Sequence, residues 1–403
     1  MSFPPPPVPK SVLGRHRILA PTAGVRVSPL CLGGMNFGDA WKDSLGECNK
    51  ETAFAMLDHF YSQGGNFVDT AVNYQFGESE QWIGEWLETR NRREEMVIAT
   101  KFTGGQYQAL GDQLIQSNFS GNGSKNLLSS FKRSLKNLKT DYIDLYYVHL
   151  YDHTTSVPEL MTTLNTLVTS RQVLYLGISD TPAWLVVKCN DYARQHGLRP
   201  FSVYQGRWGA GCRDLERDVI PMCISEGMAI APWGVLGGGG FKKAEDKEKE
   251  GTRSLQVGSR SRDEQVRSVL EKLGEKKGTG ATSVALAYVL HKAPYVFPII
   301  GGRKVEYLGQ NIEALKLRLD LEDILTIDAA YGFEIGFPHD FLSGGNNMVL
   351  GPEHNAFNGR GGFFDYPVGV RPAPPHQGAL DRQVTGIPLG QARAKEEEME
   401  ENF

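Results

Sequence analysis

The stretch NFVDTAVNY, at residues 66–74, combines a short apolar strand with two polar side chains suited to acid–base chemistry. Asp69 stands at the end of the expected strand, and Tyr74 follows in the turn after it. A free tyrosine has a pKa of about 10, so it is a weak proton donor at neutral pH. An acid–base role for Tyr74 therefore requires a cation beside it.

Two later apolar runs also end in an ionisable residue. Lys101 closes MVIATK at residues 96–101, and His149 closes DLYYVH at residues 144–149. Taken singly, each residue has an ordinary explanation: a turn or cap aspartate, a half-buried tyrosine, a solvated lysine or a core histidine. Strand ends on one face of a parallel barrel meet at one site, so together they indicate a shared site.

From residue 30 onward, short apolar runs alternate with amphipathic ones, which is typical of parallel βα units. Eight strands without a GxGxxG motif after the first favour a closed (β/α)8 TIM barrel over a doubly wound sheet. A helix at residues 282–291 and the segments beyond residue 319 are expected outside the barrel. The expected strands are residues 30–34, 66–70, 96–101, 144–150, 173–179, 201–205, 228–232 and 296–300, and the expected barrel helices are 50–64, 78–90, 126–139, 157–171, 182–196, 216–227 and 263–277.

The chain divides into three parts. Residues 1–16 begin with a proline run and are expected to form a mobile arm. Residues 17–335 hold the barrel, preceded by a β-hairpin around the PTAG sequence. Residues 336–403 form a C-terminal extension that is rich in glycine and proline and ends in the acidic tail KEEEMEENF.

Two segments interrupt the alternation of strands and helices. Residues 102–125 follow the strand that ends in Lys101, so they must lie on its face and are expected to line the substrate pocket. Residues 241–260 form a charged run after four glycines. This run is compatible with a solvated loop or with an ordered lid.

Composition excludes several classes of protein. The 403 residues are 40% hydrophobic, enough for one barrel with extensions, and the net charge of -4 gives no support for a nucleic-acid or membrane-surface partner. Five cysteines form no CxxC pair, which indicates a reducing compartment. No signal peptide or membrane-spanning run is evident. We expect a cytoplasmic protein without a membrane partner; the sequence does not predict its oligomeric state.

The motifs DTAVNY, ATK and YVH resemble those of the aldo-keto reductases over about residues 25–335. FSVYQGRW at residues 201–208 and LGISDTPAW at residues 176–184 are similar to the fungal branch of aryl-alcohol dehydrogenases and norsolorinic acid reductases. The resemblance implies a barrel whose hairpin crosses the bottom. It also implies that Asp69, Tyr74, Lys101 and His149 form a catalytic tetrad.

In that tetrad Tyr74 would donate the proton to a carbonyl oxygen. Lys101, kept cationic by Asp69, would lower the pKa of the tyrosine, and His149 would donate a hydrogen bond to the same oxygen.

A nicotinamide cofactor is implied by the chemistry and by the family, because no side chain can supply a hydride. By resemblance, Ser179, Asp180 and Gln205 would hold the carboxamide, with Asp180 where asparagine is common, and Trp208 would stack on the nicotinamide ring. An aspartate can still accept a hydrogen bond from the amide.

The rest of the cofactor site is expected near the last two strands. The glycines of PWGVLGGGG allow close approach to the pyrophosphate, and Arg303 and Lys304 would bind a 2′-phosphate and favour NADPH. Tyr307 stands where many relatives have arginine or glutamine. The expected contacts of this part are Gly234, Leu236 and Gly238 to the pyrophosphate, Arg303 and Lys304 to the phosphate, and Gln310 and Asn311 to adenine.

These features predict an NADPH-dependent reductase of aromatic or bulky aldehydes and ketones, reversible as an aryl-alcohol dehydrogenase. By resemblance, the substrate could be a small molecule of fungal aromatic polyketide metabolism, of the norsolorinic acid type. An NADPH-binding regulatory subunit with little turnover is an alternative. A metal-dependent lyase or hydrolase is a third, since His149, Asp152 and His153 could bind zinc, but no metal site is expected.

Overall fold

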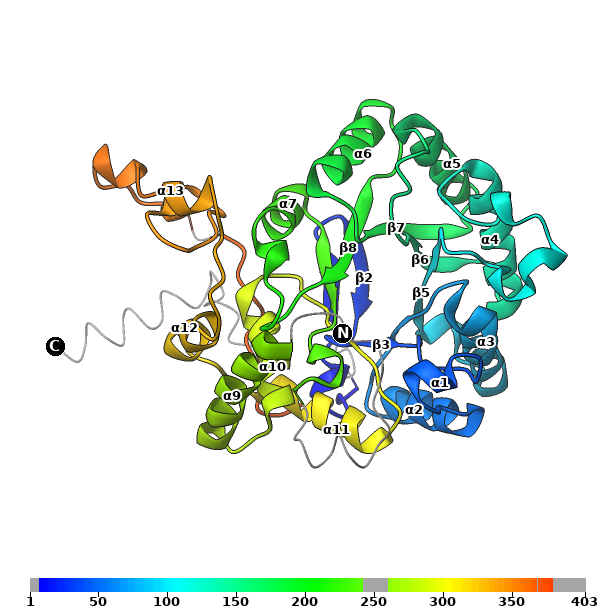
Figure 1. Ribbon diagram of the computed structural model, residues 1–403, viewed down its shortest axis with the longest axis horizontal. Coiled ribbons are helices and arrows are strands. Elements are labelled where there is room, and N and C mark those ends of the chain that lie inside the picture. Colours follow the sequence, from blue (N-terminus) through cyan, green and yellow to red (C-terminus); the bar gives the residue numbers. More distant parts are fainter. Residues whose placement is uncertain (1–6, 242–259, 368, 380–403) are drawn as a thin grey trace, which may run out of the picture.

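Eight parallel strands surround the centre of the computed structural model, which describes residues 7–241, 260–367 and 369–379 (Figure 1). The strands are β3 (Cys31–Gly33), β4 (Phe67–Asp69), β5 (Val97–Phe102), β6 (Ile143–Val148), β7 (Val173–Ser179), β8 (Phe201–Arg207), β9 (Ala229–Trp233) and β10 (Ile299–Ile300). They pair in the order β10-β3-β4-β5-β6-β7-β8-β9. A parallel bridge between Ile230 and Val296 joins β9 to the segment before β10. The sheet therefore closes into a barrel, as predicted.

Helices cover the outside of the barrel, so its strands are buried on both faces. Every residue of β5 and β6 is buried. The α-helices of the ring are α2 (Lys50–Ser62), α3 (Glu78–Arg90), α4 (Ser124–Leu138), α5 (Val157–Thr169), α6 (Ala183–Gln195), α7 (Val219–Glu226), α10 (Ala281–Lys292) and α11 (Val305–Glu313), with a short α1 (Lys42–Leu45) after β3. The 3-10 helices include η3 (Arg93–Glu95), η4 (Gln108–Gln113), η5 (Gln116–Asn118), η8 (Ala314–Lys316), η9 (Pro352–His354) and η10 (Asn358–Arg360).

The helices between β9 and β10 have the opposite roles to those predicted. All residues from Ser283 to Leu290 of α10 are buried, and α10 lies against the barrel. The charged helix α9 (Arg260–Lys277) packs on α10 and on α12 (Leu321–Asp328), farther from the strands. The prediction that α9 belongs to the barrel and α10 lies outside it is wrong. The reason is composition: α10 is apolar on nearly all sides, whereas α9 has only a narrow apolar stripe.

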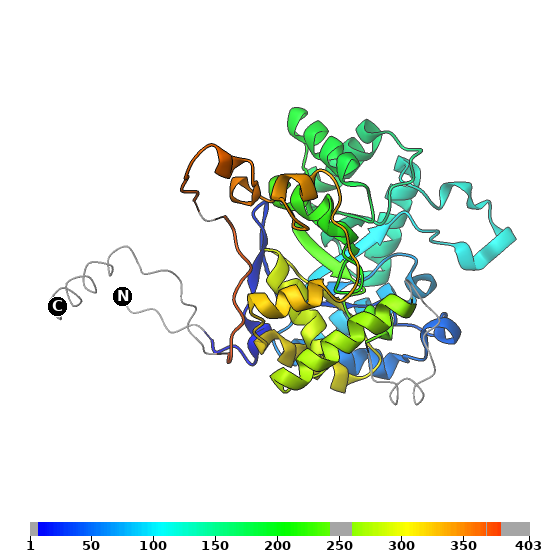
Figure 2. The ribbon, with the colours of Figure 1, turned by 60° about the vertical axis from the view of Figure 1, so that its left-hand side comes forward.

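An antiparallel hairpin of β1 (Arg17–Ala20) and β2 (Ala23–Val27) covers the start of the barrel strands. Its Leu19 and Val27 pack with Phe67 and Val97, which begin β4 and β5. Figure 2 shows the hairpin at one end of the barrel and the loop after β5 at the other. The expected hairpin is confirmed. It closes the N-terminal end of the barrel and leaves the C-terminal strand ends for a site.

Part of the expected N-terminal arm belongs to the packed structure. Val12 and Leu13, in η1 (Val12–Gly14), are buried in the main core, and Ser11 caps this turn. The Ser11 hydroxyl also donates to the backbone oxygen of Gln63, at 2.8 Å. The prediction of a separate arm is therefore wrong for residues 11–14, because these two apolar side chains supply the buried face that the proline run lacks. Residues 1–6 lie outside the described residues.

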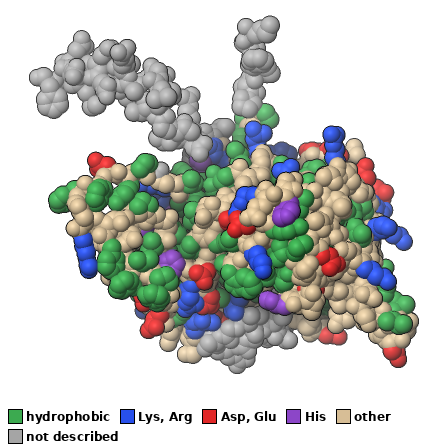
Figure 3. Space-filling view, turned by 90° about the horizontal axis from the view of Figure 1, so that it is seen from above, with side chains coloured by type: hydrophobic (Ala, Val, Ile, Leu, Met, Phe, Trp, Pro, Cys, Tyr) green, Lys and Arg blue, Asp and Glu red, His purple; other side chains and the backbone are tan. Residues whose placement is uncertain are grey.

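The C-terminal extension continues past α12 through α13 (His339–Ser343), at the upper left of Figure 1. Several of its aromatic side chains are exposed, and hydrophobic side chains gather on this side of the molecule (Figure 3). The chain then returns toward the N-terminus, where Arg15 donates to the backbone oxygen of Ala379 at 2.8 Å. The acidic tail lies outside the described residues. The exposed aromatic residues of the extension include Phe337, Phe341, Phe363 and Phe364.

Buried charges tie the loop after β8 to α10 and α12. Arg213 pairs with Glu216 of η6 (Asp214–Glu216) at 2.7 Å, and the two side chains are only 3% and 1% exposed. Lys292 pairs with Asp328 at 2.8 Å and lies 3.4 Å from Glu216. Charges this far from water are stable only when each has a partner.

We expect Arg213→Met to lower the free energy of unfolding by about 3–5 kcal/mol, because it leaves Glu216 and Asp328 short of a buried positive partner. Thermal and urea denaturation would measure the loss. Arg92→Met is the matched control, since Arg92 forms an exposed pair with Glu95 and its removal should have far less effect. Equal losses in the two variants would contradict this account of the buried charges.

Candidate active site

The ends of three neighbouring strands and the following turn bring Asp69, Lys101, His149 and Tyr74 together. Lys101 is fully buried, and its Nζ donates to Asp69 Oδ2 at 2.6 Å and to the backbone oxygen of Thr70 at 2.7 Å. Its distance to the hydroxyl oxygen of Tyr74 is 3.3 Å. The rings of Tyr74 and His149 meet edge to face, with their centroids 5.6 Å apart. The structure thus places the four residues at one site.

The position of Tyr74 depends on an unusual turn, η2 (Tyr74–Gly77). Gln75 and Phe76 have φ values of 52° and 53°, a left-handed conformation that is uncommon for residues with side chains. The Gln75 side chain secures the turn: it accepts from the backbone N–H of Trp41 at 2.6 Å and donates to the Met35 oxygen at 3.0 Å. These bonds attach the turn to the segment after β3.

Electrostatics determine which of these groups is charged. Burial lowers the pKa of Lys101, but Asp69 and Tyr74 outweigh it, so the net pKa is raised and Lys101 is a cation. Burial raises the pKa of Tyr74, and Lys101 opposes this only in part. Lys101 thus acts on the tyrosine pKa in the predicted direction, but desolvation exceeds its attraction, so the net pKa of Tyr74 is raised.

Burial lowers the pKa of His149 to about 3, and the charge of Lys101 acts in the same direction. At neutral pH the site therefore contains a protonated Tyr74, a cationic Lys101 and a neutral His149. Tyr74 and His149 keep some exposed surface, whereas Lys101 has none. A ligand at the C-terminal end of the barrel can thus contact Tyr74 and His149, but not the lysine.

The residues expected to hold a carboxamide lie beside this cluster. Gln205 of β8 donates to Asp69 Oδ1 at 2.9 Å, so it is directly connected to the tetrad. The backbone N–H of Asp180 donates to the backbone oxygen of Gln205 at 2.9 Å, and Ser179 at the end of β7 donates to Asp180 Oδ2 at 3.1 Å. The amide oxygen of Gln205 and the carboxylate of Asp180 are acceptors suited to an amide group.

Trp208 does not lie at this site. Its side chain is 0% exposed, and its indole donates to the buried Glu216 at 3.1 Å. The expected stacking of Trp208 on a nicotinamide ring does not agree with this burial, since the chain after β8 turns into the core. Trp233, which sequence reasoning missed, ends β9 with its indole nitrogen 3.2 Å from Asp180 Oδ1. Its position as the last residue of a barrel strand is the feature of the sequence that could have indicated a place at the site.

The loop after β9 and the start of α11 contain the residues expected to bind the rest of the cofactor. Gly234 and Gly238 have positive φ values of 74° and 60° and lie with Leu236 around η7 (Gly237–Gly239). Arg303 packs so closely on Gly46 that a Cβ there would lie 1.7 Å from its Nη1. Lys304 immediately precedes α11 and is exposed.

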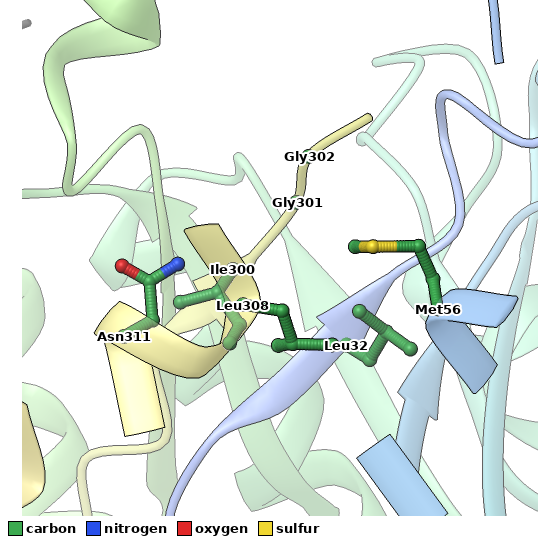
Figure 4. A pocket seen from close by; sticks show the side chains of 7 residues that line it. All are labelled: Leu32, Met56, Ile300, Gly301, Gly302, Leu308 and Asn311. Atoms are coloured by element: carbon green, nitrogen blue, oxygen red, sulfur yellow. The ribbon is translucent and has the colours of Figure 1, made fainter. Parts of the chain in front are cut away.

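Of the two residues expected to contact adenine, one lines a small pocket beside α11 and the other does not. Asn311 is 6% exposed and lines this pocket together with Gly301 and Gly302, as Figure 4 shows. Gln310 is exposed on the helix and does not line it. A Cβ at either glycine would lie in van der Waals contact with a neighbouring atom, and the pocket is a shallow one. Its other lining residues are Leu32, Met56, Ile300 and Leu308.

The segment at residues 102–125 follows the end of β5, which carries Lys101, and lies at the end of the barrel opposite the hairpin, as expected (Figure 2). Asn122 attaches it to the next loop, because its side chain donates to the Leu150 oxygen at 3.0 Å and accepts from the Asp152 N–H at 2.7 Å. Of the charged run at residues 241–260, the structure describes Phe241, which is buried, and Arg260, the first residue of α9. Residues 242–259 lie outside the described residues.

The residues weighed as zinc ligands do not converge. Asp152 accepts hydrogen bonds from the backbone N–H groups of Thr154 and Thr155, both at 2.9 Å, and so closes its own loop. His153 is exposed and packs edge to face on Tyr151. Within residues 7–241, 260–367 and 369–379, no group of three or more His, Cys, Asp or Glu side chains could hold a metal ion.

A barrel with an acid–base cluster at the C-terminal ends of its strands is typical of one class of oxidoreductase. Comparison of the sequence with known protein families identifies that class. Residues 29–332 match the aldo/keto reductase family, and the chain belongs to this family. Its members generally use NADH or NADPH.

Several fungal proteins are similar over most of the chain. An aryl-alcohol dehydrogenase of Pestalotiopsis microspora is 55% identical over 384 residues, which cover 94% of this chain and 98% of the relative. Norsolorinic acid reductase A of Aspergillus parasiticus is 57% identical over 342 residues, covering 85% and 87%. An aldo-keto reductase of Aspergillus calidoustus is 50% identical over 349 residues, covering 84% and 88%. In the described part of the chain, no helix is long and apolar enough to cross a membrane.

The lowered pKa of His149 gives a test of the site that needs no substrate. We expect its imidazole to remain neutral at about pH 5, where an ordinary histidine is mostly protonated. Nitrogen-detected NMR of the imidazole would measure this. Lys101→Met should leave the pKa below the ordinary value, because burial is the larger cause; an imidazole protonated at pH 5 in the wild-type protein would contradict the described environment.

Proposed function

We propose that this protein is an NADPH-dependent reductase of aromatic or bulky aldehydes and ketones that can also oxidise aryl alcohols. The observation that carries the proposal is the buried Lys101, within hydrogen-bond reach of both Asp69 and Tyr74. The names of the similar fungal proteins, an aryl-alcohol dehydrogenase and a norsolorinic acid reductase, support the substrate class. They also support a role in aromatic polyketide metabolism.

In this reaction Tyr74 is the proton donor to the carbonyl oxygen. Lys101 stabilises the tyrosinate that remains, and Asp69 holds Lys101 in place. His149 is neutral and can donate a hydrogen bond to the same oxygen, which stabilises the negative charge that develops there. The bound nicotinamide cofactor supplies the hydride. In the reverse direction, the tyrosinate accepts the alcohol proton.

The residues beside the tetrad fit a nicotinamide cofactor. Gln205 is connected to Asp69 and keeps an amide oxygen for the carboxamide, and the ring of Trp233 lies at the same strand ends. Arg303 and Lys304 stand before α11, where two cations and a helix start suit a phosphate. Asn311 carries an amide that can both donate to and accept from adenine.

Aromatic side chains near Tyr74 favour flat, apolar substrates. Trp41 packs edge to face on Tyr74 and Phe76, with ring centroids 6.3 and 5.8 Å apart. A substrate carbonyl at Tyr74 would therefore place its substituents near these rings, and aromatic pairs of this kind are favourable. The segment at residues 102–125 would form another wall of the pocket.

We also infer a reducing, cytoplasmic location. All five cysteines are free, although several are buried near other core residues. Burial raises the pKa of Cys189 to about 12, which makes its thiol unreactive. Free, unreactive thiols are typical of proteins that work among reduced cellular thiols.

We expect Tyr74→Phe to lower carbonyl reduction by roughly 100-fold or more, since it removes the proton donor. The dissociation constant for NADPH should change little, because the phenylalanine keeps the ring. Oxidation of NADPH with a panel of aromatic and aliphatic aldehydes and ketones would measure turnover, and fluorescence titration would measure binding.

The same experiment separates this function from its alternatives. A variant that retains most of its turnover would remove Tyr74 from the acid role. A wild-type protein that binds NADPH tightly but reduces no carbonyl would favour a regulatory subunit. Loss of activity on chelation would favour a metal-dependent enzyme instead.

Arg303→Ala combined with Lys304→Ala should weaken NADPH binding by roughly tenfold or more, because charged hydrogen bonds to the 2′-phosphate are lost. NADH has no such phosphate and should bind almost as before. Isothermal titration of both cofactors would measure the two changes. Equal losses for NADPH and NADH would contradict the assignment of these residues to the phosphate.

A further inference from the structure

The carboxylate of Asp180 is held firmly at the mouth of the barrel. Both of its oxygens lie within hydrogen-bond distance of the Trp233 indole nitrogen, at 3.2 and 3.3 Å, and Ser179 donates to Oδ2 at 3.1 Å. The backbone is held as well, because the Asp180 N–H donates to the backbone oxygen of Gln205; the φ of Asp180 is 42°. The side chain nevertheless remains exposed, so a ligand at the mouth can meet it.

This carboxylate adds negative charge to the tetrad. Lys101 is already paired with Asp69 at 2.6 Å, and Tyr74 and His149 are neutral at neutral pH. Asp180 is close enough to matter electrostatically: burial is the main cause of the raised pKa of Tyr74, and the charge of Asp180 adds to it. Together with Lys101 and Asp69, Asp180 therefore leaves the group with one negative charge in excess.

In the proposed reaction, a nicotinamide ring lies next to the charges of Lys101, Asp69 and Asp180, and the charge of this ring differs between its oxidised and reduced forms. The hydride donor must touch a carbonyl carbon whose oxygen contacts Tyr74, so the nicotinamide ring must lie within a few ångströms of the tetrad. That ring carries a positive charge when oxidised and none when reduced. A fixed carboxylate beside it attracts the oxidised form and acts little on the reduced form.

We propose that Asp180 determines the relative affinity of this protein for oxidised and reduced nicotinamide cofactor. This inference rests on the proposed function. By stabilising the oxidised cofactor, which carbonyl reduction produces, Asp180 moves the equilibrium of the bound reactants toward carbonyl reduction. Asp180 acts as a specificity-determining residue for the redox state of the cofactor, and Trp233 and Ser179 act as the donors that hold its charge in place.

The test compares the dissociation constants of NADP⁺ and NADPH in the wild-type protein and in Asp180→Asn. The asparagine keeps the size, an oxygen for the Trp233 indole and a tolerance for positive φ, but loses the charge. We expect the ratio of the NADP⁺ constant to the NADPH constant to rise roughly tenfold, and to rise less at high salt. Fluorescence titration measures both constants without turnover.

Two further variants make the result specific. Asp180→Gly is also neutral and tolerates positive φ, so it should change the ratio in the same direction even if the asparagine perturbs the site. Asp191→Asn removes an exposed carboxylate from α6, where it pairs with Arg194, and should leave the ratio unchanged.

The outcomes distinguish this inference from the proposed function. If both neutral variants weaken NADP⁺ and NADPH equally, Asp180 only shapes the site and the inference is overturned. The same conclusion follows if Asp191→Asn shifts the ratio as much as Asp180→Asn. A wild-type protein that binds neither cofactor would overturn the proposed function and this inference together.

Discussion

The site depends on one buried ion pair, Lys101 with Asp69. Burying two charges costs more free energy than their attraction returns unless further hydrogen bonds complete the arrangement. Here the backbone oxygen of Thr70 accepts from the lysine, and the amide of Gln205 donates to the aspartate. Three barrel strands, β4, β5 and β8, therefore supply the partners, and only a closed barrel brings β8 near β4. The pair in turn holds the cation that the tyrosine needs.

Much of this arrangement is readable from the sequence because barrel strands follow one another in order. A strand that ends in an ionisable residue places it on the catalytic face, so Asp69, Lys101 and His149 could be assigned without knowing their distances. The pKa of Tyr74 could not be read in this way. Its direction depends on how much water the folded chain removes from the hydroxyl, and no local pattern reports that amount.

The place of Trp208 and the roles of α9 and α10 differ from the predictions for a common reason. Both depend on contacts between distant parts of the chain. Trp208 is drawn into the core by Glu216, whose charge is balanced by Arg213 and by Lys292 from α10. Periodicity likewise marks both α9 and α10 as helices but does not show which lies nearer the strands. Both answers depend on charges and apolar surfaces that are far apart in the sequence and meet only in the folded protein.

The hairpin that closes the N-terminal end of the barrel affects the order in which ligands bind and leave at the C-terminal end. Because Leu19 and Val27 pack against the starts of β4 and β5, the N-terminal end of the barrel is closed, and ligands approach Tyr74 from the C-terminal ends of the strands. Two ligands that share one entrance cannot exchange independently, since the outer one blocks the inner one. The molecule that lies deeper must arrive first and depart last, so sealing one end of the barrel sets a sequence in time.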